Sequence, residues 1–247
     1  MITEEVTFVG GGGATLSGTI YRPETAVRGS LLMAHCFTCS QQLHTSTRLA
    51  RNLVAGEYQV MTFDFTGLGA SGGEFADTTV TSNVADITRA AVTLIERDRG
   101  PCALVGHSLG GAASVLAAAR LHGVTAVGAI ASPASVDHVR HLIDTDAGIE
   151  TEPGKFLVSV GGRPFTIGQD FLDDLERHDV MAAARSLGRP FLVVEAGADT
   201  IVGPDQTRAL AAAGSAELVV VEDADHLFSD RANADELARA VLDWLNA

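Results

Sequence analysis

Hydrophobic and polar positions along the chain follow two alternating patterns. Short runs of aliphatic and β-branched residues, such as Ser30–Ala34 and Cys102–Gly106, are followed by longer stretches rich in Ala, Leu and Arg. Short apolar runs of this kind are typical of strands buried on both faces, and their alternation with helices indicates a parallel sheet covered by helices. The pattern therefore predicts an α/β fold.

The expected elements follow one another along most of the chain. The first two strands, Val6–Val9 and Ala14–Tyr21, flank four glycines and are expected to form an antiparallel hairpin. The other predicted strands are Ser30–Ala34, Tyr58–Phe65, Cys102–Gly106, Val124–Ala131, Phe191–Ala196 and Glu217–Val221. The predicted helices lie near Leu43–Val54, Val80–Arg97, Leu109–Leu121, Asp205–Ala213 and Ala232–Leu245.

The regular alternation lapses between Pro133 and Leu187, after the sixth strand. The elements predicted in this stretch are a helix over Ser135–Asp144, a hairpin over Phe156–Phe165 that turns at Gly161-Gly162, and a helix over Gln169–Glu176. An insertion of about 55 residues with its own elements is expected to be a lid over a site rather than a loose loop. We therefore expect one domain over residues 1–247, with a lid at about 133–188.

Composition narrows the range of partners. The 247 residues carry a formal net charge of −14, which repels a polyanion such as nucleic acid at long range. The chain begins with acidic residues and shows no signal peptide, and no apolar run reaches the roughly 18 residues that cross a bilayer. We expect a cytoplasmic protein, a monomer or a small homo-oligomer, that binds neither nucleic acid nor membrane.

The pattern Gly-x-Ser-x-Gly occurs twice, around Ser108 and around Ser71. A nucleophile elbow needs a buried strand before the serine, a helix directly after it, and glycines that leave room for a strained turn. Ser108 has all three, because Ala103-Leu104-Val105 precedes it and an alanine-rich stretch follows. Ser71 lies in a glycine-rich loop. Ser108 is therefore the predicted nucleophile, at a helix N-terminus that favours negative charge.

A serine hydroxyl needs a base to accept its proton, and the base needs a third group that fixes its tautomer. In folds with such an elbow, an acid and then a histidine follow the serine along the chain. Asp199 follows the strand Phe191–Ala196 and His226 follows Glu217–Val221, so both are expected at the carboxyl edge of the sheet. We predict that His226 is the base and that Asp199 orients it.

Other residues compete for these roles. Glu195 and Asp205 are the nearest rivals of Asp199. His107 lies inside the elbow and is expected to form a hydrogen bond away from the serine hydroxyl, whereas His44 starts a helix. The remaining candidates are expected at the surface or in the lid: His122, His138, His141 and His178.

Two backbone amides are expected to form an oxyanion hole. One belongs to Leu109, directly after the nucleophile, and the other to the loop after the third strand, His35-Cys36-Phe37-Thr38-Cys39-Ser40. Similar enzymes carry His-Gly-x in this loop, with the amide of x as the donor. Phe37 is therefore the predicted second donor, with Cys36 in the place where glycine is usual.

Cys36 and Cys39 form a C-x-x-C pattern, which can be a redox pair or half of a metal site. A zinc site needs further ligands at matching spacing, and a redox pair usually opens a helix. We expect two small thiols packed behind the loop over residues 35–40, which we call the oxyanion loop. The alternative is a regulatory disulfide that distorts Phe37 and silences the site reversibly. Cys102, in a predicted core strand, is expected to be inert, and we expect no metal or organic cofactor.

Four segments together resemble the hydrolase half of bacterial bifunctional α/β-hydrolase/OsmC proteins. They are His35–Ser40, Phe63–Gly69, Gly106–Gly111 and Asp225-His226-Leu227. Two segments of the expected lid, Gly162–Phe165 and Phe171–Leu175, are similar as well. The likeness extends from about Ser30 to the C-terminus. It implies the α/β-hydrolase fold and a bacterial, esterase-like serine hydrolase with the three residues proposed above. The 247 residues hold no counterpart of the peroxide-handling OsmC domain, so peroxidase activity is not expected.

These features predict hydrolysis of a carboxylic ester, or a related acyl bond, of a small molecule through an acyl-Ser108 intermediate. Two alternatives remain: a cofactor-free perhydrolase or haloperoxidase that uses the same residues, and a catalytically silent ligand-binding protein on the same fold. Apolar residues of the expected lid predict a mostly apolar acyl pocket: Phe156, Leu157, Val158, Phe165, Ile167 and Phe171.

Overall fold

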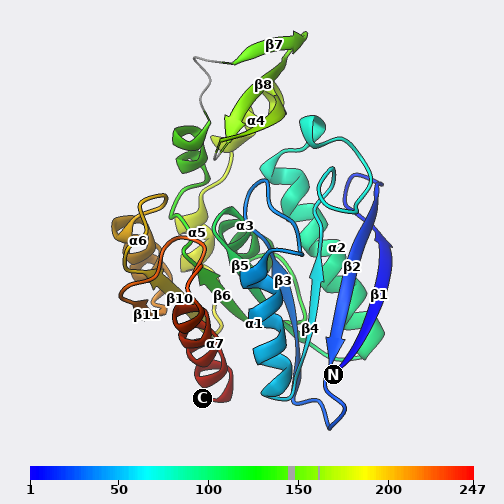
Figure 1. Ribbon diagram of the computed structural model, residues 1–247, viewed down its shortest axis with the longest axis vertical. Helices are drawn as coiled ribbons and strands as arrows, with labels where there is room; N and C mark the ends of the chain where they lie inside the picture. Colours follow the sequence, from blue (N-terminus) through cyan, green and yellow to red (C-terminus); the bar gives the residue numbers. More distant parts are fainter. Residues whose placement is uncertain (144–147, 161) are drawn as a thin grey trace.

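The central element is an eight-stranded sheet with strand order β1-β2-β4-β3-β5-β6-β10-β11 (Figure 1). A computed structural model describes residues 1–143, 148–160 and 162–247. β1 (Ile2–Val9) and β2 (Thr15–Arg22) form the predicted antiparallel hairpin, and β2 also runs antiparallel to β4 (Tyr58–Phe63). All other neighbouring strands of this sheet are parallel. They are β3 (Gly29–Ala34), β5 (Cys102–His107), β6 (Val124–Ile130), β10 (Phe191–Ala196) and β11 (Glu217–Val221).

Helices cover both faces of this sheet, which confirms the predicted α/β class. α1 (His44–Ala55) and α7 (Arg231–Asn246) pack on one face, where Leu53 and Val241 are fully buried. The other face is covered by α2 (Val80–Asp98), α3 (Leu109–Ala118) and α6 (Pro204–Gly214). Every residue of α3 is buried, because the helix lies between the sheet and the neighbouring helices. Its Gly and Ala residues allow this close packing.

Of the segment between β6 and β10, the part with β7, β8 and α4 lies at the end of the molecule opposite the two chain termini, whereas α5 packs against α3 and α6 (Figure 1). It contains the 3₁₀ helix η2 (Val136–Leu142), a three-stranded sheet of β7 (Ile149–Glu152), β8 (Lys155–Val160) and β9 (Arg163–Gly168), and the helices α4 (Gln169–Leu175) and α5 (Val180–Arg185). We call residues 133–188 the inserted segment; its role as a lid stays a prediction.

The inserted segment departs from the sequence-based expectation in several places. The helix expected over Ser135–Asp144 is a 3₁₀ helix, and its last residue, Asp144, lies outside the described residues. The expected hairpin is present as β8 and β9, although Gly161 of its turn also lies outside the described residues. β7 and α5 were not predicted. All four residues of β7 are exposed, so the strand has no apolar alternation that could reveal it.

A short 3₁₀ turn, η1 (Phe75–Asp77), precedes α2 and packs beside β9. Thr79 begins α2 with a capping box, in which its side chain accepts a hydrogen bond from the amide of Ser82. Among the helices in the described part of the chain, none is both long and apolar enough to cross a membrane.

Candidate active site

β5 passes directly into α3 through Ser108, so the strand, turn and helix expected around this serine are present. Ser108 has φ 55° and ψ −127°, a conformation that is strained for any residue with a side chain. Two glycines make the turn possible. A Cβ on Gly106 would overlap the carbonyl oxygen of Gly110, and a Cβ on Gly110 would overlap the carbonyl oxygen of His35.

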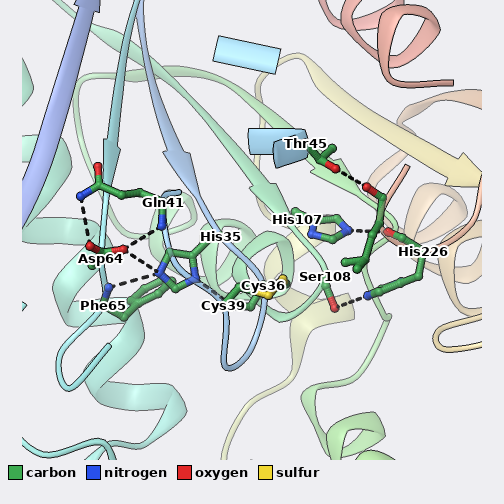
Figure 2. The surroundings of a disulfide bond; sticks show 11 residues. His35, Cys36, Cys39, Gln41, Thr45, Asp64, Phe65, His107, Ser108 and His226 are labelled. Atoms are coloured by element: carbon green, nitrogen blue, oxygen red, sulfur yellow. Dashed lines mark hydrogen bonds and ion pairs between the residues drawn. A yellow bond between two sulfur atoms is a disulfide. The ribbon is translucent and has the colours of Figure 1, made fainter. Parts of the chain in front are cut away.

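Three side chains from distant parts of the chain meet at this turn. His226 Nε2 lies 3.1 Å from Ser108 Oγ, and His226 Nδ1 lies 2.8 Å from Asp199 Oδ2. Figure 2 shows the contact between Ser108 and His226. An ionised carboxylate only accepts hydrogen bonds, so Nδ1 carries the proton and Nε2 is free to accept the proton of the serine hydroxyl. The geometry thus brings all three sequence-predicted residues together.

Asp199 is held in place as a buried carboxylate. Its Oδ1 accepts hydrogen bonds from the amides of Ile201 and Val202, at 2.7 and 3.1 Å. Burial alone would raise the pKa of Asp199, but the hydrogen bond and charge of His226 and these two amides outweigh it and lower the pKa below its usual value. Asp199 is therefore ionised at neutral pH and accepts the Nδ1 proton of His226.

The rival residues have other contacts. Glu195 is buried and binds Arg208 through both carboxylate oxygens, at 2.8 and 3.0 Å, and Asp205 lies in the first turn of α6. Ser71 accepts a hydrogen bond from the amide of Ser17 and donates one to the carbonyl of Asp64, so it fixes a loop next to the sheet. His44 starts α1, as expected.

The loop that carries His226 is held from two directions. His107 Nε2 lies 2.7 Å from the backbone carbonyl oxygen of His226, in agreement with the hydrogen-bonding role expected for His107. Thr45 Oγ1, at the start of α1, donates to the carbonyl of Leu227. Figure 2 shows both contacts beside Ser108. Sequence reasoning missed Thr45, because a threonine in a first helical turn has no distinguishing pattern.

The loop after β3 places the peptide unit between Cys36 and Phe37 next to the elbow. His35 Nδ1 lies 2.8 Å from the carbonyl oxygen of Cys36, and the Phe65 amide lies 3.4 Å from His35 Nε2. A neutral ring with its proton on Nδ1 satisfies both contacts, and burial lowers the pKa of His35, which favours this neutral form. Since a trans peptide points its N–H opposite to its C=O, His35 orients the Phe37 amide.

Leu109 is the other predicted oxyanion donor. It is the first residue of α3, and the first amides of a helix have no acceptor within the helix. Its amide is therefore free for an oxyanion and lies at the positive end of the helix dipole. Of the two sequence-predicted oxyanion donors, Leu109 thus lies at the start of α3, directly after Ser108, and Phe37 lies in the loop after β3.

Asp64 anchors the far end of the oxyanion loop. Its carboxylate is buried and accepts hydrogen bonds from the amide of Gln41, from the side chain of Gln41 and from the amide of Ala70, at 2.7, 3.1 and 3.1 Å. Gln41 Oε1 in turn accepts a hydrogen bond from Thr62. This network, part of which Figure 2 shows, fixes the chain between Cys39 and α1.

Cys36 and Cys39 form a disulfide, so the expectation of two packed thiols is wrong and the disulfide of the alternative is present. Their Cα atoms are 5.5 Å apart, within the span that a disulfide bridges. A turn, closed by the hydrogen bond from the Cys39 amide to the Cys36 carbonyl at 3.2 Å, brings the two side chains together. Among the described residues, no cluster of His, Cys, Asp and Glu is arranged to hold a metal. The redox activity of the pair stays a prediction.

Four phenylalanine rings connect the oxyanion loop to the inserted segment. The Phe37 ring stacks on Phe171 of α4 with centroids 5.2 Å apart, and it also contacts Phe75. Phe75 contacts Phe165 of β9 edge to face, at 5.4 Å. Of the apolar residues expected to line a pocket, Leu157 instead faces solvent.

The comparisons with known proteins concern the family and the fold of the chain. A family model described as the alpha/beta hydrolase family matches residues 31–240. The esterase domain of a protein from Rhodothermus marinus is 35% identical, with a TM-score of 0.81 and coverage of 99% of this chain and 98% of that one. No curated protein sequence gives a significant match.

More distant structures share the fold. Est1E from Butyrivibrio proteoclasticus, solved with ferulic acid, is 17% identical with a TM-score of 0.81, and the two chains cover 98% of each other. Mouse alpha/beta hydrolase domain-containing protein 10 is 19% identical with a TM-score of 0.78 and the same mutual coverage of 98%. The narrower resemblance to α/β-hydrolase/OsmC proteins stays a prediction. The family match and the 35% identical esterase domain show that this chain belongs to the alpha/beta hydrolase family.

Proposed function

We propose that the protein is a serine esterase that hydrolyses small carboxylic esters through an acyl-Ser108 intermediate. The observation that carries this proposal is the continuous chain of hydrogen bonds from Asp199 through His226 to the hydroxyl of Ser108. A buried carboxylate, an imidazole in the required tautomer and a strained serine at a helix N-terminus are the parts that acyl transfer needs.

The first chemical step forms the acyl-enzyme. His226 Nε2 takes the proton of Ser108 as Oγ attacks the carbonyl carbon of the ester, and Asp199 stabilises the imidazolium that results. His226 then gives this proton to the departing alcohol oxygen. In the second step His226 takes a proton from water, the resulting hydroxide attacks the acyl carbon, and the proton returns to Ser108.

The amides of Phe37 and Leu109 are proposed to bind the oxyanion that forms in both steps. Phe37 lies in the loop after β3 and Leu109 at the start of α3, so His35 orients the first amide and the helix dipole of α3 polarises the second before any substrate arrives. Preorganised donors of this type stabilise the transition state because they need no rearrangement when charge develops.

The acyl group is proposed to be apolar and to lie against Phe37, Phe75 and Phe171. These rings adjoin the oxyanion loop, so a bound carbonyl would place its acyl chain beside them. In this proposal the inserted segment, which contributes Phe171, acts as the lid and sets the length of chain that fits. The esterase activity named for the 35% identical Rhodothermus marinus domain supports the same reaction class.

A fluorophosphonate probe and a panel of nitrophenyl esters, from acetyl to dodecanoyl, test the proposal. The wild-type protein should be labelled on Ser108 and should hydrolyse the esters. Ser108→Ala should lose labelling and lower kcat by roughly 10⁴-fold or more. A wild type that neither reacts with the probe nor cleaves any ester would indicate a silent binding protein, and peracid formation faster than ester hydrolysis in hydrogen peroxide would indicate a perhydrolase.

Ser71→Ala is the matched control, because Ser71 lies in the second Gly-x-Ser-x-Gly pattern of the chain. Its hydroxyl is bound to the backbone of Ser17 and Asp64 rather than to an imidazole. The control should keep full labelling per folded molecule. Labelling that depends on Ser71 and not on Ser108 would contradict the assignment.

A further inference from the structure

We propose that Cys36–Cys39 is a thiol–disulfide exchange site that is opened by a low-molecular-weight thiol and that controls the oxyanion donor Phe37. This inference rests on the proposed function, since it concerns the regulation of the same site. The disulfide encloses a short loop of which Phe37 is the second residue, so any change in the bond acts directly on the donor.

The disulfide holds one of the two hydrogen bonds that aim the Phe37 amide. The carbonyl of Cys36 accepts from His35 Nδ1 at 2.8 Å and from the amide of Cys39 at 3.2 Å. Cys36 C=O and Phe37 N–H belong to one planar peptide unit, so fixing the carbonyl fixes the direction of the N–H. Opening the disulfide frees Cys39 to move away, which leaves the carbonyl with His35 alone.

The backbone of the oxyanion loop is strained at Thr38 while the disulfide is closed. Thr38 has φ 60°, in the left-handed region that a β-branched residue strongly disfavours. The side chain of Thr38 is buried, and the covalent ring around it prevents relaxation to a negative φ. When the ring opens, the favoured change at Thr38 rotates the adjacent peptide units, and the Phe37 amide loses its fixed direction.

Of the two bonded cysteines, Cys39 is the more exposed. Cys36 is buried, with 5% of its surface exposed. Cys39 is partly exposed and lines an open hollow of about 410 Å³ together with His44, Arg163 and Phe165. Neither Ser108 nor His226 lines this hollow, so a thiol can reach Cys39 without occupying the substrate site. The positive charge of Arg163 favours an approaching thiolate.

The thiol–disulfide exchange begins at Cys39, because this is the more exposed cysteine. The thiolate of the small thiol attacks Cys39 Sγ, the S–S bond breaks, and Cys36 leaves as a thiolate that takes a proton from solvent. A second molecule of the thiol attacks the sulfur of the first and releases Cys39 as a thiol. The disulfide gains two electrons, and the two small thiols become one small disulfide. The reverse reaction, with a small disulfide as oxidant, closes the ring again.

The oxidised protein should be the more active form. Removing one oxyanion donor altogether costs other serine hydrolases about 10²–10³ in kcat, and a donor that is loosened but present should cost less. We expect kcat to fall about tenfold on reduction, with a smaller change in KM, and to return when oxidised glutathione is added.

The experiment compares wild-type protein in two verified states. The samples are the untreated protein, protein reduced with dithiothreitol, and reduced protein that has been reoxidised. Mass spectrometry after iodoacetamide treatment shows in each sample whether Cys36 and Cys39 are joined. Nitrophenyl ester hydrolysis is then measured on each sample. The double variant Cys36→Ser/Cys39→Ser should match the reduced protein and should not respond to dithiothreitol. Cys102→Ala is the matched control, because Cys102 is buried in β5, and it should keep the full response.

Single variants test which sulfur exchanges. Cys36→Ser leaves Cys39 as a free thiol, which should form a mixed disulfide with oxidised glutathione at least tenfold faster than Cys36 does in Cys39→Ser. Equal rates, or a faster reaction at Cys36, overturn the assignment of the exchange site.

Fluorophosphonate labelling separates failure of this inference from failure of the proposed function. Equal activity of the oxidised and reduced proteins overturns control by the disulfide, whether that activity is high or absent. If Ser108 is still labelled in both states, the esterase proposal stands without redox control. If Ser108 is labelled in neither state, both proposals fail. A reversible fall in kcat that the double variant lacks supports the inference.

Discussion

The ring of His107 donates a hydrogen bond from Nε2 to the backbone carbonyl of His226, across 2.7 Å. The turn that carries Ser108 therefore also holds the loop that carries its proposed base. The two imidazoles lie against each other with centroids 4.9 Å apart. Burial lowers the pKa of His107 to about 3, and the neighbouring His226 adds to this effect, so the ring stays neutral at physiological pH.

His107 is a positioning residue, and its replacement should change kcat more than KM. His107→Phe keeps a ring but loses the donor, so the His226 loop should shift and kcat should fall about 10- to 100-fold, as expected for a misplacement of about 1 Å. His107→Gln keeps an N–H near the position of Nε2 and should stay within about threefold of wild type. Steady-state kinetics on a nitrophenyl ester measures kcat and KM for both variants and the wild type. Equal kcat for the two variants would show that the hydrogen bond has no such role.

The buried neutral state of His107 also predicts how stability depends on pH. In the unfolded chain its pKa is near 6.5, whereas in the folded protein it is about 3. Between these values the unfolded state binds a proton that the folded state does not, so stability falls as pH drops below 6.5 and continues to fall until about pH 3. The contribution is roughly 1.4 kcal/mol per pH unit in this window.

Urea denaturation of wild type and His107→Gln between pH 7 and pH 4 measures this contribution. The variant should lose stability less steeply, because glutamine does not titrate. His35, whose pKa burial also lowers, remains in both proteins and cancels in the comparison. Parallel curves for the two proteins would contradict a neutral, buried His107.

Replacing Asp199 by Asn should reduce kcat by about 10⁴-fold, because an amide that donates to Nδ1 stabilises the wrong tautomer of His226. The change should leave the fold intact, since Asn can still accept hydrogen bonds from the amides of Ile201 and Val202. Asp205→Asn is the control, because Asp205 lies in the first turn of α6 and should leave kcat unchanged. Loss of activity in the control and not in Asp199→Asn would reverse the assignment of the acid.

The backbone strain at Ser108 predicts that an inactive variant can be the more stable one. Both Ser108→Ala and Ser108→Gly should abolish hydrolysis, but only glycine adopts φ 55° without cost. After allowing for the greater freedom of glycine in the unfolded chain, Ser108→Gly should be the more stable of the two by about 1 kcal/mol. Chemical denaturation compares them, and a more stable alanine variant would argue against strain at the elbow.

Phe171 should matter for stability and for substrate size. Its ring is buried and stacks on Phe37, so Phe171→Ala should lower the free energy of unfolding by about 3–5 kcal/mol. Phe171→Leu fills more of the space and should cost less. Under conditions where both variants are folded, the alanine variant should prefer longer acyl chains than wild type in the nitrophenyl ester panel. An unchanged chain-length profile would separate Phe171 from the acyl pocket.

Most of the sheet could be predicted from the sequence, because central strands such as β5 and β10 are buried along their whole length and a β-branched run marks the edge strand β11. The predicted strands Phe191–Ala196 and Glu217–Val221 agree with β10 and β11 residue for residue. The inserted segment was harder to predict. Its short elements bury only part of their surface, and the exposed strand β7 carries no periodic signal.

Some parts of the candidate site could be predicted from the sequence and others could not. Ser108, Asp199 and His226 could be named because each follows a recognisable strand in the order that an elbow requires. The sequence offered the disulfide only as an alternative, since two cysteines three residues apart meet only if the intervening turn closes, and the turn depends on Thr38 in an unfavourable conformation. The supporting contacts of Thr45 and His35 depend on distances between distant segments, which a single sequence does not contain.

The contact between Gly110 and the carbonyl of His35 restricts how this scaffold can be redesigned. Backbone touches backbone there, so even one added methyl group at position 110 would push the start of α3 away from the end of β3. Libraries that vary residues 35–37 or 106–111 should therefore yield mostly inactive clones. Diversity placed in β8 and β9, which belong to a separate small sheet, leaves that spacing untouched. New selectivity is best sought there.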